Sequence, residues 1–261
     1  MSTVTPFLEA TNINWQHILH DCSLTVNKGD MIVLVGENGC GKSSFLRCLS
    51  GWYPLKSGTI LLSGTSIRNL SPLDKSSTIA LLPQQLNILD NIPIVEWLCN
   101  ARFRFEEPTQ KSTKKVHDLL SEYHLDHLQH RTWPQLSGGE AQRLSLLALR
   151  LQEATCWMLD EPANHLDPKV QQLVYRDIVQ AWLQGTTMIT VTHSLNLLFQ
   201  IVDKQYWDRV RIVGMKDGRI TMTQNLSSNN LANEMGQLYD LQGHFVDIQG
   251  SKQLYFSMEN T

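Results

Sequence analysis

The sequence lacks a hydrophobic segment long enough to cross a membrane. Its longest apolar runs, such as Met31–Val35, have the length of a strand, whereas a membrane helix needs about 18 or more apolar residues. The first residues also lack the basic start and apolar stretch of a secretory signal. We therefore expect a soluble, cytosolic protein with no transmembrane segment.

The sequence also lacks closely spaced cysteine pairs and an excess of basic over acidic residues. The five cysteines are scattered and form no Cys-x-x-Cys pair, which argues against a disulfide framework and a zinc site. Lys and Arg number 22 against 25 acidic residues, a net charge of −3. This balance argues against a globally basic nucleic-acid binder and leaves a local basic patch as the alternative; we expect no nucleic-acid partner. Apolar residues make up 42% of the 261, enough for a buried core.

Short apolar runs alternate with helical patterns, which predicts an α/β fold with a mostly parallel sheet. Residues 8–28 indicate an antiparallel strand pair, and residues 86–135 a helical insertion. The last 40 residues, from about 222, are polar and uneven and predict a small appended element. The strands expected in the parallel sheet are Met31–Val35, Thr78–Leu82, Cys156–Leu159 and Thr187–Val191.

A glycine-rich segment follows the predicted strand Met31–Val35 and precedes a helix-like run from Ser44 to Leu49. It fits G-x-x-x-x-G-K-[ST], in which backbone N–H groups surround phosphate oxygens at a helix N-terminus. Lys42 is expected to neutralise the β- and γ-phosphates, and Ser43 to ligate Mg²⁺. The alternative is a serine-capped glycine turn, but the pattern favours a nucleoside triphosphate. The predicted nucleotide-binding residues are Gly36, Glu37, Asn38, Gly39, Cys40, Gly41, Lys42, Ser43 and Ser44.

Two adjacent carboxylates, Asp160 and Glu161, follow the predicted strand Cys156–Leu159 and precede Pro162. In P-loop folds a strand beside the phosphate loop ends with an Asp that holds the magnesium shell. The next carboxylate can polarise the attacking water as a general base. Alone, an acidic turn before a proline explains the pair equally well. Beside a phosphate loop, the pair indicates hydrolysis of the nucleotide.

A third motif, Leu136–Glu140, lies between these two and precedes a helical run, Leu144–Leu151. Locally, Ser137 and Glu140 predict a capping box at a helix start, where the two glycines offer N–H donors to an anion. Because it lies after the phosphate loop and before the carboxylate pair, this motif resembles the signature of ATP-binding-cassette (ABC) ATPases. The resemblance covers essentially the whole chain. It implies a P-loop NTPase with an ABC ATPase core at residues 1–85 and 136–221, an antiparallel β subdomain near 8–30, a helical subdomain at 86–135 and a C-terminal extension at 222–261.

The resemblance implies roles for further residues. Gln84, followed directly by Gln85, matches the family's glutamine loop, which reaches Mg²⁺ and the attacking water. His193 matches the switch histidine that contacts the γ-phosphate, and Ser194 follows it where the family usually has Asp. The implied catalytic residues are Glu161, His193 and Gln84, and the implied Mg²⁺ ligands are Ser43, Gln84 and Asp160.

Two more positions, and the assembly, follow from the same resemblance. Asp167 is expected at a dimer interface, and Trp15 near the aromatic that stacks on adenine; for Trp15 a core or surface role is the open alternative. The family packs two copies head to tail, so that each ATP lies between Lys42 of one chain and the signature of the other. The signature residues that act in trans are Ser137, Gly138, Gly139 and Glu140.

Because the chain itself is expected to span no membrane, a transport role requires separate integral membrane subunits. The apolar stretch Leu86–Phe105 lies where the family receives a coupling helix from them. Asn69–Leu73 and the tail from Asn230 to Gly250 resemble importers of iron chelates, haem and cobalamin. This implies a homodimer, ATP and Mg²⁺, a substrate-binding protein, and a position at the cytoplasmic face of the inner membrane. The alternative is a soluble single-cassette ABC ATPase of cofactor assembly; Glu161 and His193 argue against a regulator that never hydrolyses.

Overall fold

The computed structural model describes residues 5–84, 88, 91–248 and 251–258. Short 3-10 turns occur at Ile67–Asn69, Asp126–Leu128, Trp133–Gln135 and Lys204–Arg209. The helices and strands are, in order, β1 (Leu8–Trp15), β2 (Leu19–Val26), β3 (Met31–Val35), α1 (Lys42–Leu49), β4 (Ser57–Leu62), β5 (Thr65–Ser66), α2 (Pro72–Thr78), β6 (Ile79–Leu82), α3 (Ile94–Asn100), α4 (Thr109–Glu122), α5 (Gly138–Gln152), β7 (Cys156–Asp160), α6 (Pro168–Leu183), β8 (Thr187–Val191), α7 (Leu195–Ile201), β9 (Val210–Lys216), β10 (Arg219–Asn225), α8 (Leu231–Leu238), β11 (Gln242–Ile248) and β12 (Ser251–Ser257).

The central sheet has six strands in the order β10-β9-β3-β8-β7-β6. All neighbours pair in parallel except β10, which is antiparallel to β9. Every residue of β3, β7 and β8 is buried, as continuous apolar runs predict for strands covered on both faces. The expected strand at Thr78–Leu82 begins one residue later, because Thr78 ends α2 and its hydroxyl donates to the carbonyl oxygen of Asp74 at 2.8 Å.

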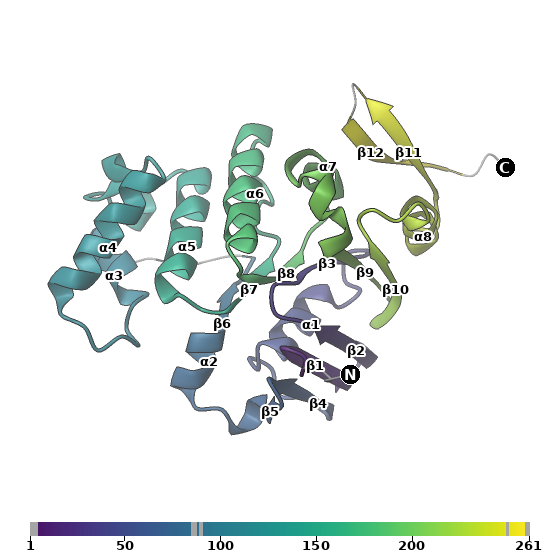
Figure 1. Cartoon of the computed structure of the whole chain (residues 1–261), viewed down its shortest axis with the longest axis horizontal. Helices are drawn as coiled ribbons and strands as arrows, with labels where there is room; N and C mark the ends of the chain where they lie inside the picture. The colour runs from purple at the N-terminus through teal and green to yellow at the C-terminus, as the bar shows by residue number, and fades with distance from the viewer. Residues whose placement is uncertain (1–4, 85–87, 89–90, 249–250, 259–261) are drawn as a thin grey trace.

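Two layers cover the central sheet (Figure 1). Helices α5, α6 and α7 lie along one face, and α1 and a four-stranded sheet, β2-β1-β4-β5, lie on the other. In that second sheet β1 pairs antiparallel with β2, Leu8 opposite Val26. The predicted α/β class, with a mostly parallel sheet and an antiparallel β unit, is confirmed.

Helices α3 and α4 form a unit at one end of the molecule, beyond α5. Ile94 of α3, Val116 of α4 and Leu147 of α5 are fully buried in one hydrophobic cluster. The unit therefore shares its core with α5, which the sequence placed outside the helical subdomain at 86–135. Residues 85–87 and 89–90, part of the apolar stretch from Leu86, lie outside the described residues.

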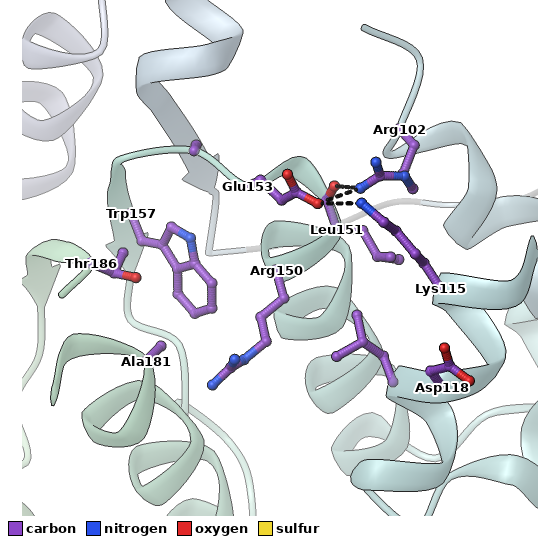
Figure 2. Close-up of a pocket in the computed structure, with 11 residues that line it drawn as sticks. Arg102, Lys115, Asp118, Arg150, Leu151, Glu153, Trp157, Ala181 and Thr186 are labelled. Carbon is purple, nitrogen blue, oxygen red and sulfur yellow. Dashed lines mark hydrogen bonds and ion pairs between the residues drawn. The ribbon is translucent and has the colours of Figure 1, made fainter. Parts of the chain in front are cut away.

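An ionic cluster fixes the far end of α5. Arg102, 2% exposed, donates to the carbonyl oxygen of Leu151 at 2.9 Å and to Glu153 Oε1 at 2.9 Å, and also to Glu107. Lys115 of α4 donates to the same Glu153 oxygen at 2.8 Å. Figure 2 shows Arg102 and Lys115 both joined to Glu153, among the residues that line a cavity of about 330 Å³. These bonds tie the C-terminal end of α5 to α4 and to the segment after α3.

The chain ends in a C-terminal unit of α8 and the hairpin β11–β12, next to α7 and the β9–β10 edge (Figure 1). The boundary expected at residue 222 falls inside β10, which pairs along its length with β9. Of the helices described, none combines the length and apolar character needed to cross a bilayer.

Candidate functional site

The phosphate loop connects β3 to α1 at the carboxyl end of the parallel strands. Gly36, Gly39 and Gly41 have φ of 143°, 83° and 104°, values that side chains rarely adopt. A Cβ on Gly36 would also lie 2.1 Å from the carbonyl oxygen of Met215. These glycines are therefore required by the backbone path. Lys42, 5% exposed, donates to the carbonyl oxygens of Gly36 and Glu37 at 2.8 Å each.

A cleft of about 1020 Å³ lies over this loop. It brings together side chains from segments that are far apart in the sequence. Ten of its lining residues were predicted: Glu37, Asn38, Gly39, Gly41, Lys42, Ser43, Ser44, Gln84, Glu161 and His193. Four were not assigned to the site in advance: Ile18, Asn164, His165 and Tyr239. Cys40 of the loop is buried beside the cleft, 8% exposed.

Asp160 lies at the end of β7, 1% exposed. Its Oδ1 accepts a hydrogen bond from Ser43 Oγ at 2.7 Å, and its Oδ2 lies 3.7 Å from Arg47 Nη2. In the described part of the chain, Oδ2 has no hydrogen-bond donor. Burial raises the pKa of Asp160, and the Ser43 hydroxyl and Arg47 oppose the shift. A buried carboxylate with a spare oxygen beside a serine hydroxyl is a donor set that suits Mg²⁺.

Replacing this carboxylate should stabilise the fold while removing the cation ligand. The pKa of Asp160 is near 3.8 in the unfolded chain and higher in the folded one. The folded protein therefore loses stability as the pH rises from 3.8 through the raised pKa, because the buried carboxyl must then carry a charge. We expect Asp160→Asn to increase the free energy of unfolding at pH 7.5 without Mg²⁺, because the amide carries no charge that burial opposes. The gain should shrink as the pH falls through the raised pKa, because the wild-type carboxyl then also becomes neutral. Urea unfolding at several pH values measures it, with exposed Asp126→Asn as the control; a destabilised Asp160→Asn chain would contradict it.

Glu161 is the centre of a second cluster in the cleft. Its Oε2 accepts hydrogen bonds from Gln84 Nε2 at 2.9 Å and from Asn164 Nδ2 at 2.6 Å. His193 Nε2 lies 3.3 Å from its Oε1. Glu161 has φ of 51°, held by its own N–H donating to the carbonyl oxygen of Val191 at 3.1 Å. The carboxylate is thus fixed between an amide pair and an imidazole, opposite the phosphate loop.

The third motif begins helix α5, as the sequence predicted. Ser137 is the N-cap: its hydroxyl accepts from Glu140 N at 3.3 Å, and Glu140 Oε2 accepts from Ser137 N at 2.8 Å. These bonds hold the pKa of Glu140 below its usual range. Gly139 leaves room for Val170, whose Cγ1 would lie 2.8 Å from an added Cβ. Among the described residues that line the cleft, none belongs to Ser137–Glu140.

Two predicted site residues have local partners. Asp167 caps α6, its Oδ1 accepting from Lys169 N at 3.1 Å and Val170 N at 3.2 Å. Trp15 stacks on Tyr53, with ring centroids 4.5 Å apart and planes at 1°. It does not line the cleft as described, whereas Ile18 does. Adenine stacking by Trp15 and an interface role for Asp167 stay predictions.

Asn164 and Tyr239 are the contacts that sequence reasoning missed. Asn164 belongs to the segment Asn164–Asp167, in which the family resemblance assigns a role to Asp167. An amide three residues after a catalytic candidate can reach back to it, as Asn164 does to Glu161. Tyr239 follows α8, and its hydroxyl accepts the Gly36 N–H at 3.1 Å. No local pattern signals a contact across 203 positions.

Comparisons with known proteins show which proteins the chain resembles. The family model described as "ABC transporter" matches residues 19–164. SkfE, the SkfA peptide export ATP-binding protein of Bacillus subtilis, is 30% identical over 199 residues, covering 76% of this chain and 79% of its own length. PotG, the putrescine transport ATP-binding protein of Escherichia coli, is 29% identical over 196 residues, and the match spans 73% of this chain but 52% of PotG.

Among solved structures, an ABC transporter in an inward-facing conformation, described as of metal-chelate type, superposes with a TM-score of 0.78. The match covers 97% of both chains at 20% sequence identity. At this identity the likeness concerns the fold, which includes the C-terminal unit of α8 and the hairpin.

Proposed function

Because the chain belongs to the ABC transporter family, we propose that it is the ATP-hydrolysing subunit of a membrane importer and works as a homodimer. One observation carries the proposal: a single cleft places the Glu161 cluster opposite the phosphate loop. A binding module that never hydrolyses ATP has no need of a carboxylate held in this way.

The residues of the cleft have separate roles in binding and hydrolysis. The loop N–H groups and Lys42 bind the phosphates. Glu161 orients and deprotonates the attacking water, while Gln84 and Asn164 keep its carboxylate in place. His193, beside Glu161, would contact the γ-phosphate. Ser43, Asp160 and Gln84 would hold Mg²⁺, which neutralises charge on the phosphates when bound.

The assembly is proposed to be head to tail. Within one chain the Ser137 end of α5 does not line the described cleft, so a second copy would bring its own signature to the γ-phosphate. Hydrolysis then removes the anion that the facing helix N-terminus holds, and the dimer opens. We propose that this movement drives membrane subunits at the cytoplasmic face of the inner membrane. The proposed cargo is an iron chelate, haem or a cobalamin-like molecule, delivered by a substrate-binding protein.

Docking to the membrane subunits is expected to use the helical unit. Phe103 follows α3, is 69% exposed, and belongs to the apolar stretch Leu86–Phe105, which is expected to receive a coupling helix. We expect Phe103→Asp to reduce capture of the membrane subunits about tenfold, with ATP hydrolysis by the isolated chain unchanged. The matched control is Leu73→Asp, 58% exposed and on α2.

The experiment is affinity purification of the tagged chain from detergent-solubilised native membranes, with partners identified and quantified by mass spectrometry. A polytopic membrane protein in equal amount supports the transporter assignment, and its identity points to the cargo. Soluble partners alone would instead support an ATPase of cofactor assembly. Equal capture by Phe103→Asp and wild type would place the docking surface elsewhere.

A further inference from the structure

The C-terminal unit (α8, β11 and β12) packs on the ATPase core as a rigid piece. Leu231 and Met235 of α8 are buried against the central sheet layer. The hairpin meets α8 backbone to backbone: a Cβ on Gly243 would lie 1.9 Å from the carbonyl oxygen of Ala232, and one on Gly236 would lie 2.5 Å from Gly243 N. Such close packing leaves little freedom between helix and hairpin.

From this unit Tyr239 reaches the phosphate loop. Its hydroxyl accepts the N–H of Gly36, the first glycine of the loop, at 3.1 Å. Its ring packs edge-on against Phe256 of β12, with centroids 5.5 Å apart. Lys216 and Asp240 form an ion pair beside it, at 2.7 Å. The Tyr239 ring is therefore held by Phe256, and this places its hydroxyl beside the Gly36 N–H.

A second contact joins the same unit to the helix that follows His193. Asn196 Nδ2 donates to the carbonyl oxygen of Leu254 at 3.0 Å, and Leu254 N donates to Asn196 Oδ1 at 2.8 Å. The Asn196 side chain thus pairs with the Leu254 backbone as a neighbouring strand would, and these two bonds attach the first turn of α7 to β12. The C-terminal unit thus touches both the entry of the phosphate loop and the segment that carries His193.

From these contacts we propose that the C-terminal unit is part of the ATP site, with Tyr239 as a positioning residue for the phosphate loop and Asn196 as one for His193. The inference rests on the proposed ATPase function. The Gly36 backbone packs against Met215, and its N–H is held by the Tyr239 hydroxyl. Without that hydroxyl the N–H loses its acceptor, and a loop that moves to regain one no longer matches the phosphates.

The two residues should affect different steps. For Tyr239→Phe, which removes one oxygen, we expect the Kd for ATP to rise about three- to tenfold, with kcat nearly unchanged. For Asn196→Ala we expect kcat to fall by a similar factor, with the Kd unchanged, because His193 is displaced while the loop is intact. Tyr255→Phe is the matched control: Tyr255 lies on the same hairpin but is 60% exposed.

The measurements are Kd by fluorescence with a methylanthraniloyl-ATP probe, kcat by phosphate release, and melting temperature without nucleotide. A higher Kd for Tyr239→Phe, with Tyr255→Phe at the wild-type value, supports the proposal. If both variants had a lower melting temperature but wild-type Kd and kcat, the C-terminal unit would have only a structural role, and the proposal would be wrong. Failure of the wild-type chain to bind the probe would instead reject the ATPase function itself.

Discussion

A Glu161→Gln chain should bind ATP with near wild-type affinity and release phosphate at least about 100-fold more slowly, the lower range for loss of a general base. Binding persists because the phosphates are held by the loop and Lys42, which the substitution does not touch. Hydrolysis fails because an amide cannot take a proton from water. In addition, its –NH₂ group would meet the N–H donors of Gln84 and Asn164 or the His193 imidazole.

The same variant should accumulate as an ATP-bound dimer, since the γ-phosphate that joins the two chains is not removed. Size-exclusion chromatography with and without ATP measures the dimer, and a phosphate-release assay measures turnover. Glu122→Gln, an exposed position at the end of α4, is the matched control. Near-normal phosphate release by Glu161→Gln would remove Glu161 from its role and shift attention to His193.

The parts of the site that could be predicted from sequence are those built from neighbouring residues. The phosphate loop is one such part, because strand, glycines and helix follow each other directly and the positive φ values of Gly36 and Gly41 leave no choice of residue. The capping box of Ser137 and Glu140 is another. Glu161, Gln84 and His193 could be placed together only through the family resemblance, because no local pattern says which strands are adjacent.

What could not be predicted depends on tertiary packing. The contact between Tyr239 and Gly36 requires α8 to dock on the β9–β10 edge, and no local pattern in the tail says that it packs beside the phosphate loop. The helical unit is a similar case: Leu147 of α5 belongs to its core, but the polar signature at the start of that helix suggested a boundary there. The strand patterns predicted the fold class well because burial on both faces leaves a continuous apolar run.

The signature should act on the nucleotide of the partner chain, and mixing two defective chains tests this. Lys42→Ala removes the phosphate contact, and Ser137→Arg blocks the start of α5, so each homodimer should be inactive. In a mixed dimer one site combines both defects, while the other combines wild-type Lys42 with wild-type Ser137. Random pairing of equal amounts leaves about a quarter of all sites intact. We therefore expect phosphate release to recover to about a quarter of the wild-type rate, from a background near zero.

If the signature served the nucleotide of its own chain, every site in the mixture would carry a defect and no activity would return. The geometry favours recovery: the capped start of α5 lies outside the described lining of the cleft, and α5 is fixed at its other end by Arg102 and Glu153. A start of α5 that lies outside the described cleft of its own chain is free to present Ser137 to a facing chain. Dilution sharpens the test, because activity that depends on a mixed dimer must fall faster than in proportion to chain concentration.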